Sequence, residues 1–215
     1  MSTLSAKVST EFRLPIFKRE LDIFPAHLFG DSEKSGLWYV IQTKSRQEKA
    51  IARSLLESSI SYYLPQYERE IRRAGRIFRS YLPLFPGYVF LHGTPADRLF
   101  ALRTDCALRI LPVADQTGLH CELEAIQKLL TSGRPIVSHP FVSTGDRVRI
   151  VGGPFHDVEG IVLREKGAFH LIVSVTFISA SVAVEVDREY VERSTTGRFR
   201  RELRHPAGSR RSEYR

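Results

Sequence analysis

The spacing of apolar residues along the chain changes near residue 132. Before this point, apolar runs typical of strands alternate with stretches in which apolar residues recur every three to four positions, as in helices. After it, short β-type segments follow one another, separated by turns rich in glycine and serine. The pattern predicts an α+β fold, in which a sheet with helices on its faces is followed by a small five-stranded β-barrel.

The elements of the first half can be placed individually. Strands and hairpin arms are predicted at residues 37–43, 60–64, 67–73, 76–82, 88–91 and 107–112. Helices are predicted after residues 45 and 94 and across residues 123–130. Ser45 and Glu48 have the S-x-x-E spacing of a capping box, in which each side chain bonds an orphan backbone N–H. We therefore expect the first helix to begin at Ser45.

The same reading divides the chain into five parts. Residues 1–36 form an N-terminal extension, whose apolar residues near its end predict that it docks on the fold. A first domain over residues 37–131 is joined to a second over residues 144–193 by a linker, residues 132–143, which contains two prolines. Residues 194–215 form a basic tail.

Positive charge is concentrated in two of these regions. The net charge is +8, and residues 44–80 and 194–215 each carry a net +5, so the remainder is slightly acidic. Two separate basic regions indicate a polyanionic neighbour, and nucleic acid is the commonest. The alternative for the tail is that it only aids solubility.

The first basic region is organised by its predicted structure. Arg46, Lys49 and Arg53 fall on the side of the first helix opposite its apolar residues. The arms at 67–73 and 76–82 predict a long β-hairpin whose tip carries Arg73 and Arg76. Both features suit nucleic-acid contact, although a basic helix face or hairpin can also simply be solvated.

The sequence gives little support for a metal-binding protein, a phosphate-binding enzyme or a membrane protein. The seven histidines include no metal-binding i, i+4 pair, and no phosphate-binding G-x-x-x-x-G-K-[ST] loop occurs. Cys106 and Cys121 have no metal-type spacing, so we expect reduced thiols, no metal, no cofactor and no enzymatic activity. No apolar run reaches the roughly 20 residues of a membrane helix, and no signal pattern opens the chain. A cytoplasmic, monomeric protein without membrane contact is expected.

Two stretches resemble the domains of the NusG/RfaH family of bacterial transcription elongation factors. Residues 37–40 (LWYV), the helix after them and residues 83–90 (PLFPGYVF) resemble the N-terminal NGN domain. The pattern G-D-x-V-x-I-x-x-G-P-F-x-x-x-x-G at residues 145–160 resembles the KOW motif of the C-terminal domain. A KOW motif alone is weak evidence for this family, because ribosomal proteins also carry it. Here, however, the two matches occur in the family's order and spacing.

The resemblance implies a docking surface for RNA polymerase. The NGN domain would grip the clamp helices of the polymerase with an apolar patch, which maps here to Phe85, Pro86, Tyr88 and Phe90. Aromatic anchors on a rigid strand suit an interface. Because side chains alternate along a strand, Val89 is expected to face inward when Tyr88 and Phe90 face out. The alternative is that these aromatics belong to the core.

The resemblance also implies contact with DNA in the transcription bubble. RfaH-like members place the first strand–helix junction against exposed non-template DNA. Lys44, Arg46 and Gln47 occupy that junction here. The predicted nucleic-acid contacts are these three residues with Lys49 and Arg53 of the helix face and Arg73 and Arg76 of the hairpin tip.

In the KOW domain, Gly153 and Gly160 are expected to serve backbone geometry, where a side chain would clash. Phe155 is expected to be an exposed aromatic that, with Ile178, contacts a partner, which in the family is ribosomal protein S10 or Rho. The stretch 178–183 (ISASVA) departs from the F-G-R-x-T-P type of housekeeping members. This departure puts those partners in doubt and favours a specialised paralogue.

The expected function is thus that of an elongation regulator that binds RNA polymerase and promotes processivity or antitermination on selected operons. A housekeeping NusG-type elongation and termination factor is the first alternative. A KOW-containing, ribosome-associated RNA-binding protein is the second, and such a protein would not need the apolar patch at residues 85–90.

Overall fold

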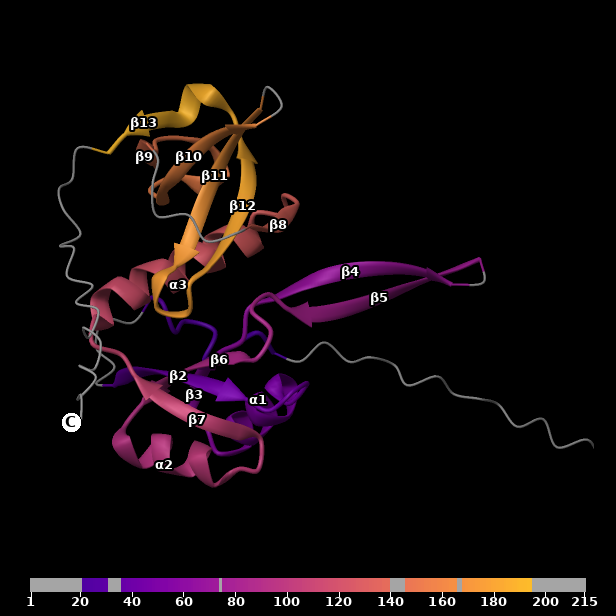
Figure 1. The fold of residues 1–215 in the computed structure, drawn as a ribbon, viewed down its shortest axis with the longest axis vertical. Helices are drawn as coiled ribbons and strands as arrows, with labels where there is room; N and C mark the ends of the chain where they lie inside the picture. The colour runs from indigo at the N-terminus through magenta and orange to yellow at the C-terminus, as the bar shows by residue number, and fades with distance from the viewer. Residues whose placement is uncertain (1–20, 31–35, 74, 140–145, 166–167, 195–215) are drawn as a thin grey trace, which may run out of the picture.

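A computed structural model describes residues 21–30, 36–73, 75–139, 146–165 and 168–194. Most of the N-terminal extension, part of the linker and the basic tail after residue 194 lie outside the described residues. The described chain forms an N-terminal sheet with helices, a long hairpin and a C-terminal sheet (Figure 1). The α+β class predicted from the sequence is therefore confirmed. No helix among the described residues is long and apolar enough to span a membrane.

The N-terminal sheet has five strands in the order β1-β3-β6-β2-β7. All neighbouring strands are antiparallel. The strands are β1 (Ile23–Phe24), β2 (Leu37–Thr43), β3 (Ser61–Tyr63), β6 (Tyr88–Gly93) and β7 (Ala107–Pro112). The edge strand β1 comes from the N-terminal extension, so the end of that segment does dock on the first domain.

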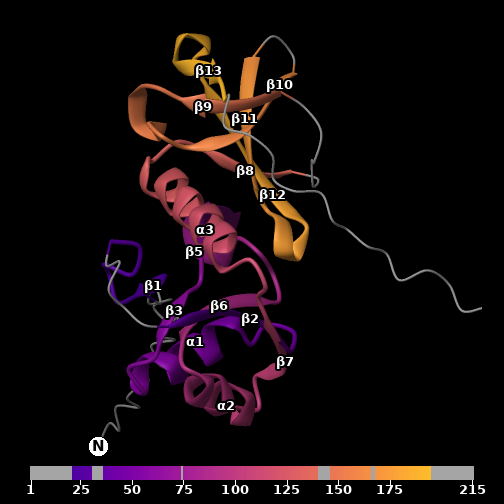
Figure 2. The ribbon, with the colours of Figure 1, turned by 90° about the vertical axis from the view of Figure 1, so that its left-hand side faces the viewer.

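Helices cover both faces of this sheet (Figures 1 and 2). On one face, Val89 and Leu91 of β6 pack in one apolar cluster with residues of α1 (Glu48–Glu57) and α2 (Pro95–Arg103). On the other face, Val40 and Phe90 pack in a second cluster with residues of α3 (Gln116–Thr131). The central residues of β2 and β6 are consequently buried whichever way their side chains point.

The hairpin β4 (Gln66–Arg73) and β5 (Arg76–Pro83) forms a separate two-stranded sheet, as the sequence predicts. It projects from the N-terminal sheet in Figure 1. Its base is fastened to α1, because the Nζ of Lys49 donates a hydrogen bond of 2.7 Å to the backbone oxygen of Tyr81. The hairpin therefore leaves the domain from an anchored base.

The C-terminal sheet has six strands in the order β13-β9-β10-β11-β12-β8. Five were predicted, and the sixth, β8, comes from the segment expected to be a linker. It pairs with β12 over four residues, so this stretch is extended and adds a strand to the sheet. The strands are β8 (Ile136–His139), β9 (Asp146–Ile150), β10 (Glu159–Glu165), β11 (Ala168–Val175), β12 (Ala180–Val186) and β13 (Val191–Arg193). Three short 3-10 turns are η1 (Gly153–Phe155), η2 (Thr176–Ile178) and η3 (Arg188–Tyr190).

Helix α3 lies between the N-terminal sheet and the C-terminal sheet (Figures 1 and 2). It contacts β2 on one side and β11, η1 and η2 on the other. Buried residues of both domains, such as Phe90, Leu123 and Val173, consequently belong to one continuous apolar cluster.

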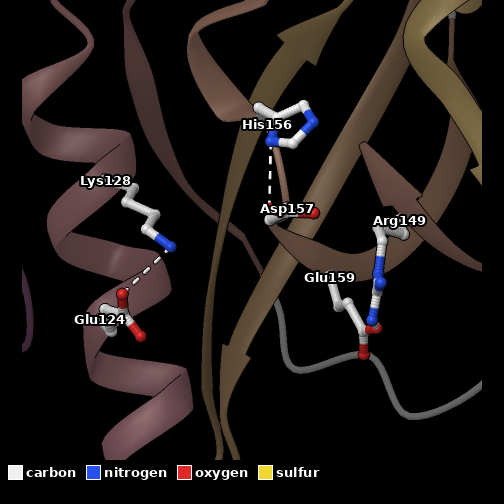
Figure 3. A network of polar contacts seen from close by, with 6 residues as sticks. All are labelled: Glu124, Lys128, Arg149, His156, Asp157 and Glu159. Atoms are coloured by element: carbon white, nitrogen blue, oxygen red, sulfur yellow. Dashed lines mark hydrogen bonds and ion pairs between the residues drawn. The ribbon is translucent and has the colours of Figure 1, made fainter. Parts of the chain in front are cut away.

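Ion pairs near α3 are local to single elements or adjacent strands (Figure 3). Lys128 pairs with Glu124 one turn earlier on α3, at 3.1 Å, and Arg149 pairs with Glu159 across β9 and β10, at 2.7 Å. Exposed pairs of this kind contribute about 0–1 kcal/mol each. None of the pairs drawn joins α3 to the C-terminal sheet, whereas apolar residues of both belong to one cluster.

Candidate polymerase and nucleic-acid interfaces

The Phe-Pro-Gly-Tyr turn before β6 is held by α1. The carboxylate of Glu48 is buried and accepts a hydrogen bond of 2.7 Å from the backbone N–H of Gly87. Gly87 has a φ of +84°, a left-handed conformation that glycine adopts without steric cost. Its carbonyl oxygen accepts from the N–H of Thr43, at 2.8 Å. The turn is thus fixed both to the end of β2 and to the start of α1.

This arrangement corrects the prediction of a capping box at Ser45 and Glu48. The first helix begins at Glu48 with Gln47 as its N-cap residue, and no side chain caps it. Arg46 has a φ of +61°, so the chain turns sharply between β2 and the helix and cannot be helical there. Glu48 bonds the backbone of a distant turn instead of the helix start.

Two of the four residues predicted to dock on RNA polymerase are buried. Phe85 is 4% exposed and Phe90 is fully buried, with their rings in edge-to-face contact at 6.2 Å between centroids. The expected exposure of Phe90 was wrong because the sheet is covered on both faces, so alternation along β6 does not separate inside from outside. Phe85, in the turn before β6, packs in the same apolar cluster. Pro86 is exposed and Tyr88 is half-buried against the core. These two residues are the part of the predicted patch that a partner can reach.

The predicted basic face of α1 is not continuous. Arg46 precedes the helix, and Lys49 is engaged at the base of the hairpin. Gln47 is half-buried and its Oε1 lies 3.5 Å from the Sγ of Cys106. Lys44, Arg46 and Arg53 are exposed. The cations that remain accessible therefore lie in the β2–α1 junction and on the outer side of the helix.

Arg73 and Arg76 face each other in the register of β4 and β5, next to the hairpin turn. Arg76 is exposed. The hairpin thus carries this pair of positions away from both sheets (Figure 1). Such a location suits contact with a large external partner.

In the C-terminal domain, Phe155 is not the exposed aromatic that the sequence predicted. It is 2% exposed and packs in the apolar cluster, with the guanidinium of Arg134 5.8 Å from its ring centroid. The 3-10 turn η1, rather than an extended loop, directs the ring inward. Ile178 in η2 is half-buried against the same cluster.

Gly153 and Gly160 lie where close neighbours leave little room for a side chain. Gly153 has a φ of +70°, and a Cβ there would lie 3.3 Å from the ring of Tyr190. A Cβ on Gly160 would lie 2.5 Å from the carbonyl oxygen of Ile172 on β11. Neither position accommodates a side chain without movement of its neighbours.

A polar contact that the sequence did not predict joins the two domains. The backbone N–H and the hydroxyl of Thr176 in η2 both bond the carboxylate of Glu122 on α3, at 3.0 Å and 2.5 Å. Burial raises the pKa of Glu122, and the two hydrogen bonds from Thr176 oppose this shift. No local signal in the sequence could reveal the contact, because its partners are 54 residues apart.

An α+β region bearing a basic hairpin, followed by a strand-rich region with a KOW pattern, is the arrangement that the resemblance to the NGN and KOW domains implies. The family model described as "NusG: Transcription termination factor nusG" matches residues 36–118. This part of the chain is therefore similar to the domain of NusG-type transcription factors.

Several relatives carry the name transcription termination/antitermination protein NusG. The protein of Vibrio vulnificus is 28% identical over 178 residues, which is 73% of this chain and 94% of the relative. The protein of Pseudomonas aeruginosa is 27% identical over 179 residues, covering 73% and 97% of the two chains. The protein of Escherichia coli strain K12 is 26% identical over 179 residues, covering 73% and 96%.

Proposed function

We propose that the protein is a transcription elongation regulator that binds RNA polymerase through its NGN domain and promotes processivity or antitermination on selected operons. It acts without catalysis, as a monomer that links the polymerase to a second partner. The observation that carries the proposal is the turn at residues 85–88, where Pro86 and Tyr88 are presented on a backbone fixed by the buried carboxylate of Glu48. A rigid apolar turn can dock on another protein without a large ordering cost.

The second contact in this proposal is with DNA in the transcription bubble. Lys44 and Arg46 are exposed at the β2–α1 junction. Phosphates neutralised by such cations release counterions, so binding would weaken as salt increases. With Arg53 on the helix and Arg76 on the hairpin, these side chains supply positive charge on the domain that would bind the polymerase.

The C-terminal domain would recruit the second partner, for which ribosomal protein S10 and Rho are the family's candidates. Phe155 is buried, so Ile178 and its turn η2 remain as the contact proposed for that partner. Thr176 in the same turn is bonded to Glu122 of α3. A partner that binds η2 would consequently compete with Glu122 of α3 for Thr176.

The restriction to selected operons rests on the stretch 178–183. Here the chain passes from η2 through Ser179, which has a left-handed φ of +50°, into β12. The F-G-R-x-T-P type of loop in housekeeping members is replaced by ISASVA. The housekeeping alternative is favoured by the length of the match, which spans 94–97% of relatives named for both termination and antitermination. Genome-wide polymerase occupancy after deletion of the gene distinguishes the two, since the specialist affects few operons.

The experiment that tests polymerase binding is co-purification of tagged protein with bacterial RNA polymerase core enzyme. Tyr88→Ala is expected to reduce the recovered polymerase at least tenfold, because it removes the accessible aromatic of the turn. Leu108→Ala is the matched control, since Leu108 is 59% exposed on β7 at the edge of the same sheet. Full recovery of polymerase by a folded Tyr88→Ala variant would refute the proposed docking surface.

A further inference from the structure

The two faces of the β4–β5 hairpin differ in charge. Directly paired residues of an antiparallel ribbon share a face, and successive residues alternate between faces. The register pairs Glu70 with Arg79 and Glu68 with Tyr81, so these residues lie on one face. Both hairpin glutamates are therefore on this face, which we call the acidic face; it also carries Arg72.

The carboxylates of the acidic face are paired with an arginine on the same face. The Nε of Arg79 lies 3.0 Å from a carboxylate oxygen of Glu68 and 3.6 Å from one of Glu70. The hydroxyl of Tyr81 donates to the other oxygen of Glu68, at 3.2 Å. These contacts also verify that the residues share a face. An anion approaching this side would meet carboxylates already paired with the nearest arginine.

The opposite face, which we call the basic face, contains no acidic residue. It carries Arg69 and Arg76 and, between them, the directly paired Ile71 and Phe78. Both arginines are exposed, and among the described residues neither forms an ion pair. Ile71 is 44% and Phe78 37% exposed. The basic face thus presents two exposed cations with an exposed apolar pair between them, whereas Arg79 of the acidic face is paired with carboxylates.

We propose that the basic face of this hairpin binds double-stranded DNA by lying in the major groove. This inference deepens the nucleic-acid role proposed above for the hairpin tip, but it concerns a duplex rather than the single strand of the bubble. Charge complementarity selects the partner, because two unpaired arginines with no carboxylate between them match a row of phosphates. Anchoring of the ribbon's base by Lys49 fixes the direction in which this face is presented.

The dimensions of the ribbon favour a duplex of the B form. A major groove about 12 Å wide admits a two-stranded β-ribbon, whereas side chains cannot read the deep, narrow major groove of an RNA duplex. Eight residues per strand give an arm of roughly 27 Å, which is longer than the groove is deep. In this placement Arg69 and Arg76 contact phosphates, and Ile71 with Phe78 contacts apolar base edges such as thymine methyl groups.

The test measures binding of the full chain to a fluorescent DNA duplex of about one and a half to three helical turns by anisotropy, over a series of salt concentrations and without polymerase. Arg69→Gln and Arg76→Gln are each expected to weaken binding about eightfold at 0.1 M salt, and the double variant to lower the salt slope by about 2. Phe78→Ser is expected to weaken binding with the slope unchanged. Thermal unfolding of each variant verifies the fold.

Arg72→Gln is the matched control, because it removes the same charge from the same strand three residues from Arg69 but on the acidic face. It is expected to change affinity less than twofold. An Arg72→Gln effect equal to that of Arg69→Gln would refute face-specific binding and leave only general attraction. Tighter binding of an RNA duplex, or of single-stranded DNA, would overturn the choice of partner.

The result is separable from the proposed docking on polymerase. Tyr88→Ala is expected to bind the duplex like the unchanged protein, since Tyr88 is not on the hairpin. A variant that loses polymerase binding but keeps duplex binding has its defect in the turn at residues 85–88. A variant with the reverse pattern has its defect in the hairpin. The basic tail is present in every variant, so differences among them report the hairpin alone.

Discussion

The hydrogen bond between Glu48 and Gly87 makes a strong prediction about stability. Glu48 is 7% exposed, and its carboxylate receives the N–H of Gly87 at 2.7 Å. Glu48→Ala removes this acceptor and leaves an N–H without its partner. Hydrogen bonds to charged groups contribute about 1.5–3 kcal/mol, so we expect a loss of about 2 kcal/mol in the free energy of unfolding. For a chain of this size that corresponds to a decrease in Tm of roughly 4–8 °C.

The assay is urea unfolding followed by circular dichroism, with Glu57→Ala as the control. Glu57 is exposed at the other end of the same helix, where a negative charge opposes the helix dipole, so its removal should be neutral or slightly stabilising. Glu48→Gln keeps an oxygen acceptor and should fall between the two variants. A Glu48→Ala protein within 0.5 kcal/mol of the unchanged one would refute the reasoning. Polymerase recovery should fall with stability, because the turn that presents Tyr88 loses its anchor.

Two further predictions concern the C-terminal domain. Gly160→Ala should destabilise the protein by about 1–3 kcal/mol in urea unfolding, since its Cβ would lie 2.5 Å from the carbonyl oxygen of Ile172. Gly30→Ala, where the nearest atom is 3.6 Å away, should change little, and equal effects would contradict this account. Because burial raises the pKa of Glu122, the folded state holds that proton more tightly than the unfolded chain, so this group's contribution to stability increases as pH falls from neutral toward the ordinary glutamate value of 4.5. The unchanged protein should therefore gain unfolding free energy relative to Glu122→Gln as pH falls from neutral, and a difference that does not change with pH would contradict this prediction.

The sequence by itself determined most of the elements and their order. The run at residues 37–43 forms β2 over the predicted residues, and the hairpin arms differ from prediction by a single residue at each end next to the sheet. The second helix begins directly after residue 94, as predicted, and its cap residue Thr94 bonds Asp97, which is only three residues away. Each of these features depends on neighbours close in the chain, so the local pattern contains the information.

The tertiary structure decided which side chains a partner can reach. Phe85, Phe90 and Phe155 are buried because α3 and the opposing sheets cover them, and those elements come from distant parts of the sequence. Glu48 has the spacing of a helix cap, yet it bonds Gly87, 39 residues away. Alternation along a strand shows that neighbours point in opposite directions, but only the packing of other elements decides whether either direction leads to solvent.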